Sequence, residues 1–370
     1  MTLPLYSNSG APNEFNRVQN AGLWYDKFCN KWRQEKGYWT LQAGHGNRTD
    51  PPKLQWIKTL AGKNTGDTSL ISEMVNRRAA MVYALGGQLR VFATDWRFVT
   101  GLGREHPVEN GFAWHHTLGT AYLPGSSVKG LVRAWAREGE EDETNKEAID
   151  RIFGPANGKK QAGSIIFFDA LPLSPVQLEA DVMTPHYSQY YKKDNHNLPP
   201  GDWMSPEPIQ FLTVAEGQEF LFALAPRRPD DEGDVELAAT WLEAALAWLG
   251  AGAKTAAGYG RFSRQGEKEE KLLKKQQKEK ERAAQEARLM EMSPLRREME
   301  EDGYSSAGFM EKLTNKWLGR MEDKDAPAEE KAEIARLLME WYENYNSDQW
   351  KKPNKKNQKK ISRIKKILGE

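Results

Sequence analysis

The sequence has very little cysteine and no long apolar run. Cys29 is the only cysteine among 370 residues, so an internal disulfide and a multi-cysteine zinc site are both excluded. A single thiol also fits a reducing compartment. The most apolar segment, Leu237 to Leu249, contains Glu243 and is too short to span a bilayer, and the first residues lack a basic region followed by an apolar run. We therefore expect a cytoplasmic protein with no membrane partner.

An excess of charge of one sign is also missing. The chain has 53 Lys and Arg residues against 52 Asp and Glu residues, so only local clusters can indicate a polyanionic partner. One cluster lies at the C-terminal end, where nine Lys or Arg residues from Lys351 onward face the single acid Glu370. We predict a basic tail over 351–370. It either adds nonspecific RNA affinity, docks on a neighbouring subunit or serves as a disordered solubilising end.

The stretch GAGAKTAAGYGRF, residues 250–262, lacks the spacing of a nucleotide-binding loop. A P-loop needs glycine directly before its Lys-Thr pair and again five positions earlier, but Ala253 and Trp248 occupy those positions. The dinucleotide fingerprint would need a third glycine at Thr255, and the stretch follows a predicted helix instead of a strand. We therefore expect no nucleotide cofactor. Two interpretations remain: a tight helix-to-strand turn, or a loop that brings backbone close to a ligand.

Hydrophobic periodicity predicts a mixed helix-and-sheet core. Helical spacing of apolar residues predicts a helix from about Asp67 to Gly86, and alternation predicts a strand over 88–99. The later segments are a helix over 126–138, strands over 164–173 and 218–226, a helix over 234–250 and a strand over 259–266. This βαββαβ order predicts an α+β fold with a ferredoxin-like (RRM-like) sheet, which packs its helices on one face and leaves the other free.

Composition divides the chain into five segments. Beyond residue 265, i,i+4 Glu-to-Lys pairs support a solvated helix with little to bury. The predicted segments are an N-terminal part packing on the core (1–66), the core (67–265) with an insertion at about 175–217, a charged helical linker (266–293), a helical appendage (294–350) and the basic tail (351–370).

A second stretch carries a family resemblance. YLPGSSVKGLVRAWAR, residues 122–137, resembles the Pro-Gly-Ser-Ser-x-Lys-Gly-x-x-Arg element of the RAMP proteins of type III CRISPR systems, whose ferredoxin-like core also ends with a loop like GAGAKTAAGYGRF. The segments NAGLWYDKF, GLGREHPVENGFAWHHTLGT, GSIIFFDALPL and MTPHYSQYY are similar to one subfamily, the sixth RAMP subunit of the Cmr-type (III-B) effector complex. The resemblance covers about residues 20–265 and leaves out the linker and the helical tail.

The resemblance implies a non-catalytic, RNA-binding subunit. In this family, backbone subunits hold the guide RNA (crRNA) through phosphate contacts for target RNA binding in antiviral defence, and this subunit lies toward the 3′ end of the guide. The implied partners are the guide RNA, the complementary target RNA, the other RAMP backbone subunits and the small helical subunit of the complex.

Residues of both motifs are suited to binding phosphate. Ser126 or Ser127 can cap the predicted helix, whose first free amides and positive dipole end favour an anion. Lys129, Arg133 and Arg137, at i, i+4 and i+8, form a basic stripe beside the apolar face. We expect the helix and the glycine loop to share RNA phosphates, against the alternative of an ordinary capped helix and a plain turn. The candidates in the loop are Gly252, Lys254, Gly258, Tyr259, Gly260 and Arg261.

The insertion is the candidate for the family's thumb, a hairpin-like element that wedges between bases. By analogy it extends from about Val176 to Gln210. Its aromatic rings can stack on bases or pack in a core, and two lysines stand nearby for phosphate. These residues are Tyr187, Tyr190, Tyr191, Trp203, Lys192 and Lys193.

Histidines leave an enzymatic alternative open. Some RAMP proteins are metal-independent ribonucleases that use histidine, and the first long loop holds His115 and His116, with His106 and Glu105 upstream. Adjacent histidines in an extended segment point to opposite sides, so they do not easily converge on one phosphate. The alternatives to the RNA-binding subunit are thus an endoribonuclease that processes the guide and a purely architectural subunit.

Other polar residues of the core receive structural interpretations. His186 is assigned a buried, hydrogen-bonding role, and Asp95 and Asp169 are expected to be structural because they lie on predicted strands. No compact carboxylate cluster of the kind a metal-dependent nuclease needs occurs in the core motifs, so we expect no metal.

Overall fold

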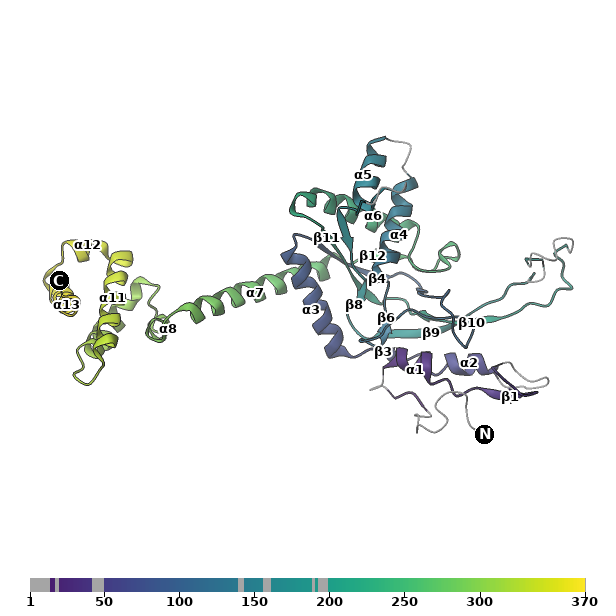
Figure 1. The fold of residues 1–370 in the computed structure, drawn as a ribbon, viewed down its shortest axis with the longest axis horizontal. Helices are drawn as coiled ribbons and strands as arrows, with labels where there is room; N and C mark the ends of the chain where they lie inside the picture. Colours follow the sequence, from purple (N-terminus) through teal and green to yellow (C-terminus); the bar gives the residue numbers. More distant parts are fainter. Residues whose placement is uncertain are drawn as a thin grey trace. The chain divides into compact units, whose positions relative to one another are not determined.

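The computed structural model describes residues 14–16, 20–41, 50–138, 143–155, 161–187, 190–191 and 199–369. The chain divides into two compact units, Met1–Gln276 and Gln277–Glu370. Figure 1 shows the helices and strands of both. No helix in the described ranges is long and apolar enough to cross a membrane.

An antiparallel sheet forms the centre of the first unit. Its strand order is β12-β4-β11-β7, and β8 also pairs with β11. Helix α4 precedes β7, and helix α6 joins β11 to β12, so the predicted order of helices and strands and the mixed fold are confirmed. The bounds are β4 (Gln88–Thr94), α4 (Gly125–Glu138), β7 (Ile165–Phe167), β8 (Leu171–Pro172), β11 (Glu219–Pro226), α6 (Gly233–Trp248) and β12 (Phe262–Arg264).

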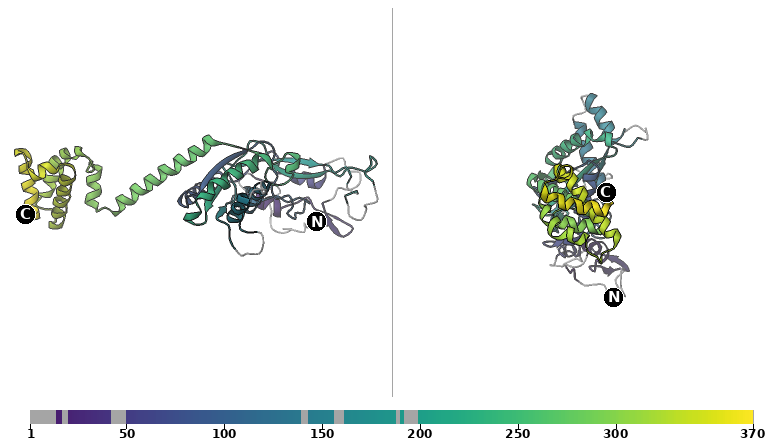
Figure 2. Two further views of the ribbon diagram at one scale, coloured as in Figure 1. Left: turned by 90° about the horizontal axis from the view of Figure 1, so that it is seen from above. Right: turned by 90° about the vertical axis from the view of Figure 1, so that its left-hand side faces the viewer.

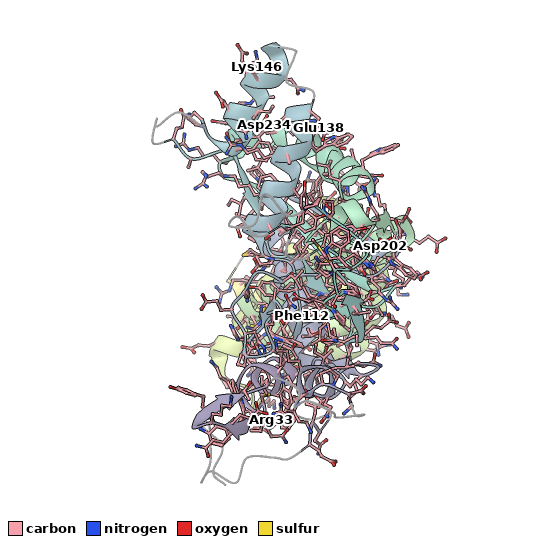
Figure 3. All side chains as sticks on the ribbon, turned by 90° about the vertical axis from the view of Figure 1, so that its right-hand side faces the viewer. Arg33, Phe112, Glu138, Lys146, Asp202 and Asp234 are labelled. Carbon is pink, nitrogen blue, oxygen red and sulfur yellow. The ribbon has the colours of Figure 1, made fainter. Side chains whose placement is uncertain are left out.

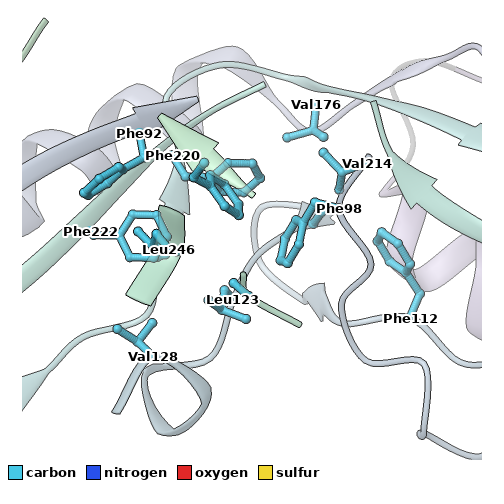
Figure 4. Close-up of a cluster of buried hydrophobic side chains, with 14 of the residues drawn as sticks. Phe92, Phe98, Phe112, Leu123, Val128, Val176, Val214, Phe220, Phe222 and Leu246 are labelled. Atoms are coloured by element: carbon cyan, nitrogen blue, oxygen red, sulfur yellow. The ribbon is translucent and has the colours of Figure 1, made fainter. Parts of the chain in front are cut away.

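Successive side chains of the central strands point to opposite faces of the sheet and contribute to two separate hydrophobic cores. On one face, the rings of Phe92 and Phe222 meet edge to face at 5.3 Å, and helices α4 and α6 cover them with Val128 and Leu246 (Figure 4). Burying an aromatic ring of this size is worth about 2 kcal/mol or more. The other side chains of β4 and β11 point to the opposite face, where Val91 is completely buried.

The opposite face is covered by helix α3 (Thr68–Ala84), on the side of the sheet away from α4 and α6 (Figure 1). The Asp67 carboxylate caps this helix by accepting from the Ser69 and Leu70 amides, and Gly86 follows its end with φ +71°. The buried stripe of α3 consists of Ile71, Val75, Ala79 and Val82. The predicted helix is confirmed, but the expectation of a free sheet face is wrong because the apolar side of α3 occupies it.

The charged helix α7 (Gly266–Glu291) is one continuous helix (Figure 2). Its first turns are not simply solvated, as the sequence had suggested. The carboxylate of Glu269, 5% exposed, accepts from the Val91 amide at 2.9 Å and pairs with Arg264 at 2.9 Å. Leu272 packs into the core beneath α3. The expectation of little to bury is therefore wrong for the start of this helix.

The start of α6 is held by a buried carboxylate, Asp234, labelled in Figure 3. It accepts from the Ser164 hydroxyl at 2.6 Å and from Arg151 Nε at 3.0 Å. Burial alone would raise the pKa of Asp234, but the hydrogen bonds from Arg151 and Ser164 outweigh it and lower that pKa. The carboxylate therefore stays ionised and fixes α6 to the loop before β7.

The insertion is built on a two-stranded ribbon. Strands β9 (Val176–Met183) and β10 (Ile209–Val214) pair antiparallel, and β3 (Asn64–Thr65) adds to the free edge of β9. At its base, Arg97 pairs with Glu179 at 2.6 Å and with Asp181 at 2.9 Å. The segment predicted as an insertion thus contains the two strands β9 and β10.

The described N-terminal residues pack on the core of the first unit through aromatic side chains. Trp24 and Trp56 are buried with ring centroids 5.2 Å apart, and the Trp56 indole donates to the Tyr25 carbonyl at 3.2 Å. The remaining elements of this unit are α1 (Ala21–Lys27), β1 (Arg33–Glu35), β2 (Tyr38–Thr40), α2 (Pro52–Ile57), β5 (Trp114–His115), β6 (Thr120–Ala121) and α5 (Glu143–Phe153).

The second unit has a hydrophobic core of its own. Its helices are α8 (Pro294–Glu301), α9 (Met310–Lys312), α10 (Leu318–Met321), α11 (Ala328–Tyr345), α12 (Ser347–Lys351) and α13 (Lys355–Leu368). Apolar residues at helical spacing fill this core, namely Phe309, Leu313, Trp317, Ile334, Leu338, Trp341 and Tyr342, whereas Leu337 of the same pattern is only partly buried and Tyr345 is exposed. Ile361 and Ile364 of α13 belong to the same core. The interpretation of 351–370 as a disordered end is therefore wrong, because isoleucines at helical spacing anchor α13.

Candidate nucleic-acid interface

Helix α4 begins one residue earlier than the sequence suggested. The Gly125 amide donates to Asp169 Oδ1 at 2.6 Å, so Asp169 has the structural role that we expected and itself satisfies the helix start. A side chain at Gly125 would lie 2.4 Å from the Phe167 carbonyl oxygen, which explains the glycine. Ser126 and Ser127 are exposed residues of the first turn, so the prediction that either caps the helix is wrong. Within the described residues, the Ser126 amide has no protein acceptor.

The glycine loop, residues 250–261, folds back on the segment that follows β4. The Ala253 amide donates to the Val99 carbonyl at 2.8 Å, and the Gly260 amide donates to the Arg97 carbonyl at 2.9 Å. Gly250 follows α6 with φ +78°, as its predicted position at the helix end requires. These bonds make the loop a fixed wall instead of a mobile flap.

Two of the loop glycines are explained by backbone packing. Gly252 has φ +82°, and a Cβ there would lie 2.0 Å from the Val99 carbonyl oxygen. Gly260 has φ +73°, and its Cβ would lie 2.0 Å from the Ala251 carbonyl oxygen. Gly258 differs, because a Cβ at this position would meet open space. The first two glycines thus allow protein backbone, not a ligand, to approach closely.

A cleft of about 390 Å³ brings the two motifs together. Ser127 and Leu131 of α4 line one side, and Gly250, Gly252 and Ala253 of the loop line another. The third side is the run 100–104, which ends in the exposed Arg104. Segments more than a hundred residues apart in sequence therefore meet in one concave surface. We call this surface the motif cleft.

The basic stripe of α4 lies elsewhere. Lys129 follows Ser127 by two residues, which turns it about 200° around the helix axis, away from the motif cleft. Burial, and then the charges of Arg133 and Arg227, lower the pKa of Lys129. Arg133 Nε is buried without a hydrogen-bond partner in the described residues, and Arg137 is exposed. Neither Lys129 nor Arg133 is among the residues that line the motif cleft.

The structure instead defines a basic cluster of Lys129, Arg133 and Arg227. None of the three forms an ion pair with a carboxylate in the described ranges. Arg227 donates from Nε to the Gly163 carbonyl at 2.8 Å, which leaves the outer part of its guanidinium available. Sequence reasoning missed Arg227 and Arg104. Two sequence features could have indicated them: Arg227 begins an Arg-Arg pair directly after the predicted strand 218–226, and Arg104 ends the run Gly-Leu-Gly-Arg.

The charged and aromatic residues of the loop contact the base of the β9-β10 ribbon. Lys254, in the left-handed region at φ +61°, donates to Met183 Sδ at 2.9 Å. The Tyr259 hydroxyl donates to Asp181 Oδ2 at 2.6 Å, and burial, followed by Asp181, raises the pKa of Tyr259 to about 12. Arg261 donates to the Ala247 carbonyl at 3.1 Å. These side chains tie the loop to the ribbon and to the end of α6.

Aromatic rings of the candidate thumb are open to solvent. Tyr191 and Trp203 are each 70% exposed, and Tyr190 is 41% exposed, whereas Tyr187 is half-buried. Core packing is therefore excluded for Tyr191 and Trp203. His186 is exposed too, so the buried role assigned to it is wrong.

Lys192 and Lys193, the two lysines proposed beside these rings, lie outside the described residues.

The histidines of the long loop serve the fold. His106 stacks on Tyr25 with ring centroids 4.5 Å apart, and its Nδ1 accepts from the Val108 amide at 3.1 Å. Burial lowers the pKa of His106 to about 4. His115 Nδ1 accepts from the Leu118 amide at 3.3 Å, and burial lowers its pKa, whereas His116 is exposed. Within the part of the chain that the structure describes, no three His, Cys, Asp or Glu side chains gather as a metal site.

The pKa of His106 predicts a pH-dependent loss of stability. In the unfolded chain this histidine has a pKa near 6.5 and binds a proton below that pH. In the folded protein the imidazole stays neutral down to about pH 4. The free energy of unfolding should therefore fall by roughly 3 kcal/mol as the pH drops through this window. Urea unfolding at several pH values measures this fall. His106→Asn should flatten the profile and exposed His116→Asn should not; equal profiles for wild type and His106→Asn would contradict the assignment.

Comparison with known proteins finds a family similar to the central part of the chain. Residues 85–263 match the RAMP superfamily, and this range contains the sheet, α4, α6 and both motifs. The resemblance noted from the sequence is thereby confirmed.

Two relatives carry a subunit name. The chain is 31% identical over 228 residues to "CRISPR system Cmr subunit Cmr6" of Pyrococcus furiosus, covering 46% of this chain and 66% of that protein. It is 29% identical over 124 residues to "CRISPR system CMR subunit Cmr6" of Saccharolobus solfataricus, covering 33% and 38%. The alignments thus span just under two thirds and about two fifths of these relatives.

Two solved structures are similar to part of the chain. The crystal structure of Cmr6 from Pyrococcus furiosus matches with 28% identity and a TM-score of 0.32, covering 48% of this chain and 97% of that one. A cryo-EM structure of the type III-B Cmr-beta bound to cognate target RNA contains a chain that matches with 20% identity and a TM-score of 0.46, covering 58% and 71%.

Proposed function

We propose that this protein is a non-catalytic RNA-binding subunit of a type III-B CRISPR effector complex that holds the guide RNA toward its 3′ end. The observation that carries the proposal is the motif cleft, in which Ser127 of the first motif meets Gly250 and Gly252 of the second. The similarity to proteins named Cmr6 supports the choice of complex. On this proposal the partners are guide and target RNA, the other RAMP subunits and the small helical subunit, in the cytoplasm.

The sheet and its two helices are best interpreted as a ferredoxin-like RAMP core. Antiparallel strands in the order β12-β4-β11-β7, with α4 and α6 on one face, fit the split βαβ connectivity of that fold. Since α3 covers the other face, RNA does not lie across the sheet as it does in RRM proteins. The RNA path instead follows the edges of α4 and the glycine loop.

Two groups of donors border this path. In the motif cleft, the Ser127 hydroxyl and the exposed Arg104 guanidinium suit one phosphate near the positive end of α4, and the Ser126 amide of the same helix turn is a further donor. On the other side of α4, the basic cluster of Lys129, Arg133 and Arg227 suits a second phosphate. Phosphate contacts of this kind bind RNA without reading its sequence, as a subunit that carries many different guides needs.

The absence of catalysis is part of the proposal. Ribonuclease chemistry needs a base and an acid on opposite sides of one phosphate. Here the ring of His106 is stacked on Tyr25, and Nδ1 of His115 is occupied by the Leu118 amide. The exposed Tyr191 and Trp203 rings of the ribbon are proposed to stack on bases.

An assay with labelled guide RNA and its complement tests this function. We expect salt-sensitive binding without cleavage, and Arg104→Gln should weaken binding by roughly five-fold through the loss of one phosphate contact. Gln retains the first three carbons of the side chain and a polar end group, so the measured loss reports mainly the guanidinium and its charge. His116→Ala serves as the control and should change nothing. RNA cleavage that His115→Ala or His116→Ala abolishes would instead identify an endoribonuclease, and unaltered binding by Arg104→Gln would remove this residue from the RNA path.

A further inference from the structure

Helix α13 of the second unit has two contrasting faces. Ile361 and Ile364 are buried in the core of that unit. Four lysines and one serine are exposed on the other side: Lys355, Lys356, Lys359, Ser362 and Lys366. Lys351 and Lys352, just before the helix, are exposed as well. We call the exposed lysines of 351–366 the lysine face.

Several other cations of this unit pair with carboxylates. Lys316 pairs with Asp302 at 2.7 Å, Arg320 pairs with Glu330 at 2.9 Å, and Arg363 binds Glu322 at 2.6 Å. By contrast, no lysine of the lysine face lies within 4 Å of a carboxylate in the described residues. Arg363, and to a lesser extent Lys366, lower the pKa of Glu322, and that carboxylate is already bound to Arg363.

Other cations of α13 show what structural lysines do in this unit. Lys360 is 8% exposed and donates to the Thr314 hydroxyl at 2.6 Å. Lys365 lies over the Trp350 ring, 5.3 Å from its centroid. These side chains hold the helix in place. The lysine face makes no comparable contact, so the fold does not account for its charge.

The spacing of the lysine face suits an extended polyanion. Lys355, Lys359, Ser362 and Lys366 stand at i, i+4, i+7 and i+11, a stripe about 16 Å long on a helix that rises 1.5 Å per residue. Ammonium groups bind phosphate as point charges and do not distinguish bases. We propose that the lysine face is a second, sequence-independent binding surface for the phosphate backbone of single-stranded RNA.

This surface is independent of the proposed guide-binding function. It lies outside residues 85–263, in a unit with its own core. Its effect would be to raise the affinity of the whole chain for any RNA strand nearby through a second point of attachment. An RNA that is not a guide therefore probes it.

The test compares two triple variants of the full-length protein. Lys355→Gln/Lys359→Gln/Lys366→Gln removes three charges from the lysine face. Lys271→Gln/Lys274→Gln/Lys278→Gln removes three exposed charges from α7, where glutamates alternate with the lysines and Lys274 pairs with Glu270 at 3.3 Å. Binding of fluorescein-labelled oligo(U), about 20 nucleotides long, is measured over a range of KCl concentrations by anisotropy.

The lysine-face variant should bind oligo(U) about ten-fold more weakly near 0.1 M salt, with a log-log salt slope smaller by about 2, because three phosphate contacts are lost. The α7 variant should bind as wild type does, and the corresponding triple Lys→Arg variant should retain binding. Since the substituted residues are exposed, all variants should keep the thermal unfolding midpoint of the wild type.

Unchanged affinity and salt slope in the lysine-face variant would overturn the proposal. The lysine face would then be assigned to a protein partner instead of RNA. An equal loss in the α7 variant would also overturn it, since net charge alone would then explain binding. Should the triple variant unfold early, Lys355→Gln/Lys366→Gln must still give an intermediate slope. The oligo(U) measurement is repeated with the lysine-face substitutions added to Arg104→Gln, in which the proposed guide-binding cleft is altered. The lysine-face substitutions should weaken oligo(U) binding there as well, so this result does not depend on whether the motif cleft binds guide RNA.

Discussion

Gly252→Ala should lower the free energy of local unfolding around the glycine loop by about 3 kcal/mol, through left-handed backbone strain and overlap with a neighbouring carbonyl. Gly252 has φ +82°, and a Cβ there would lie 2.0 Å from the Val99 oxygen. The loop would have to leave Val99 and break the bond from the Ala253 amide. Amide hydrogen exchange of α6 and β12, read by mass spectrometry, measures the loss within the first unit.

Gly258→Ala is the matched control. Its φ is +91°, so alanine suffers the same backbone strain, but the new Cβ meets open space. We expect a loss of only about 1 to 2 kcal/mol. Equal losses in the two variants would show that the close approach of Gly252 to Val99 does not fix the loop, and the motif cleft would lose its rigid wall.

The second large effect concerns RNA affinity. Lys129→Gln/Arg133→Gln/Arg227→Gln should weaken guide binding by roughly 50-fold near 0.1 M salt and reduce the salt slope by about 2. The three cations lie close enough for Arg133 and Arg227 to lower the pKa of Lys129, and no carboxylate pairs with them in the described ranges. Fluorescence anisotropy over a salt series gives both quantities.

A stability measurement distinguishes binding from a folding defect in this variant. Three uncompensated cations repel one another, so their neutralisation should leave the first unit as stable as the wild type or slightly more stable. The α7 variant Lys271→Gln/Lys274→Gln/Lys278→Gln is the control for net charge. If the basic-cluster variant binds guide RNA as tightly as the wild type, the basic cluster on α4 does not contact the RNA. If the α7 control variant loses as much affinity, the net charge of the protein explains the effect.

Much of the fold could be predicted because local patterns coincide with real boundaries. Asp67 and Gly86 mark the two ends of α3, and Gly250 follows the end of α6. The covered sheet face could not be predicted, since periodicity shows that a helix is amphipathic but not which surface it meets. The anchoring of α13 was obscured by its lysines, although Ile361 and Ile364 stand at helical spacing.

The candidate site could be predicted only in part. The meeting of the α4 start with the glycine loop was expected, and the motif cleft confirms it for Ser127. The helical period already separates Ser127 from Lys129, so the sequence itself argues against a phosphate shared by Lys129 and the loop. Arg104 and Arg227 come from segments that only tertiary structure brings beside α4. Their contribution could not be recognised without it.

Crosslinking of a 4-thiouridine guide RNA to the intact protein, with the attachment sites identified by mass spectrometry, tests the central claim most directly. The account predicts crosslinks in residues 100–104, 124–133 and 250–258, which contain lining residues of the motif cleft together with Lys129 and Arg133 of the basic cluster, and near Arg227. Substitution of Arg104 or Arg227 by glutamine should reduce them. A guide that binds tightly but crosslinks to none of these segments would contradict the account.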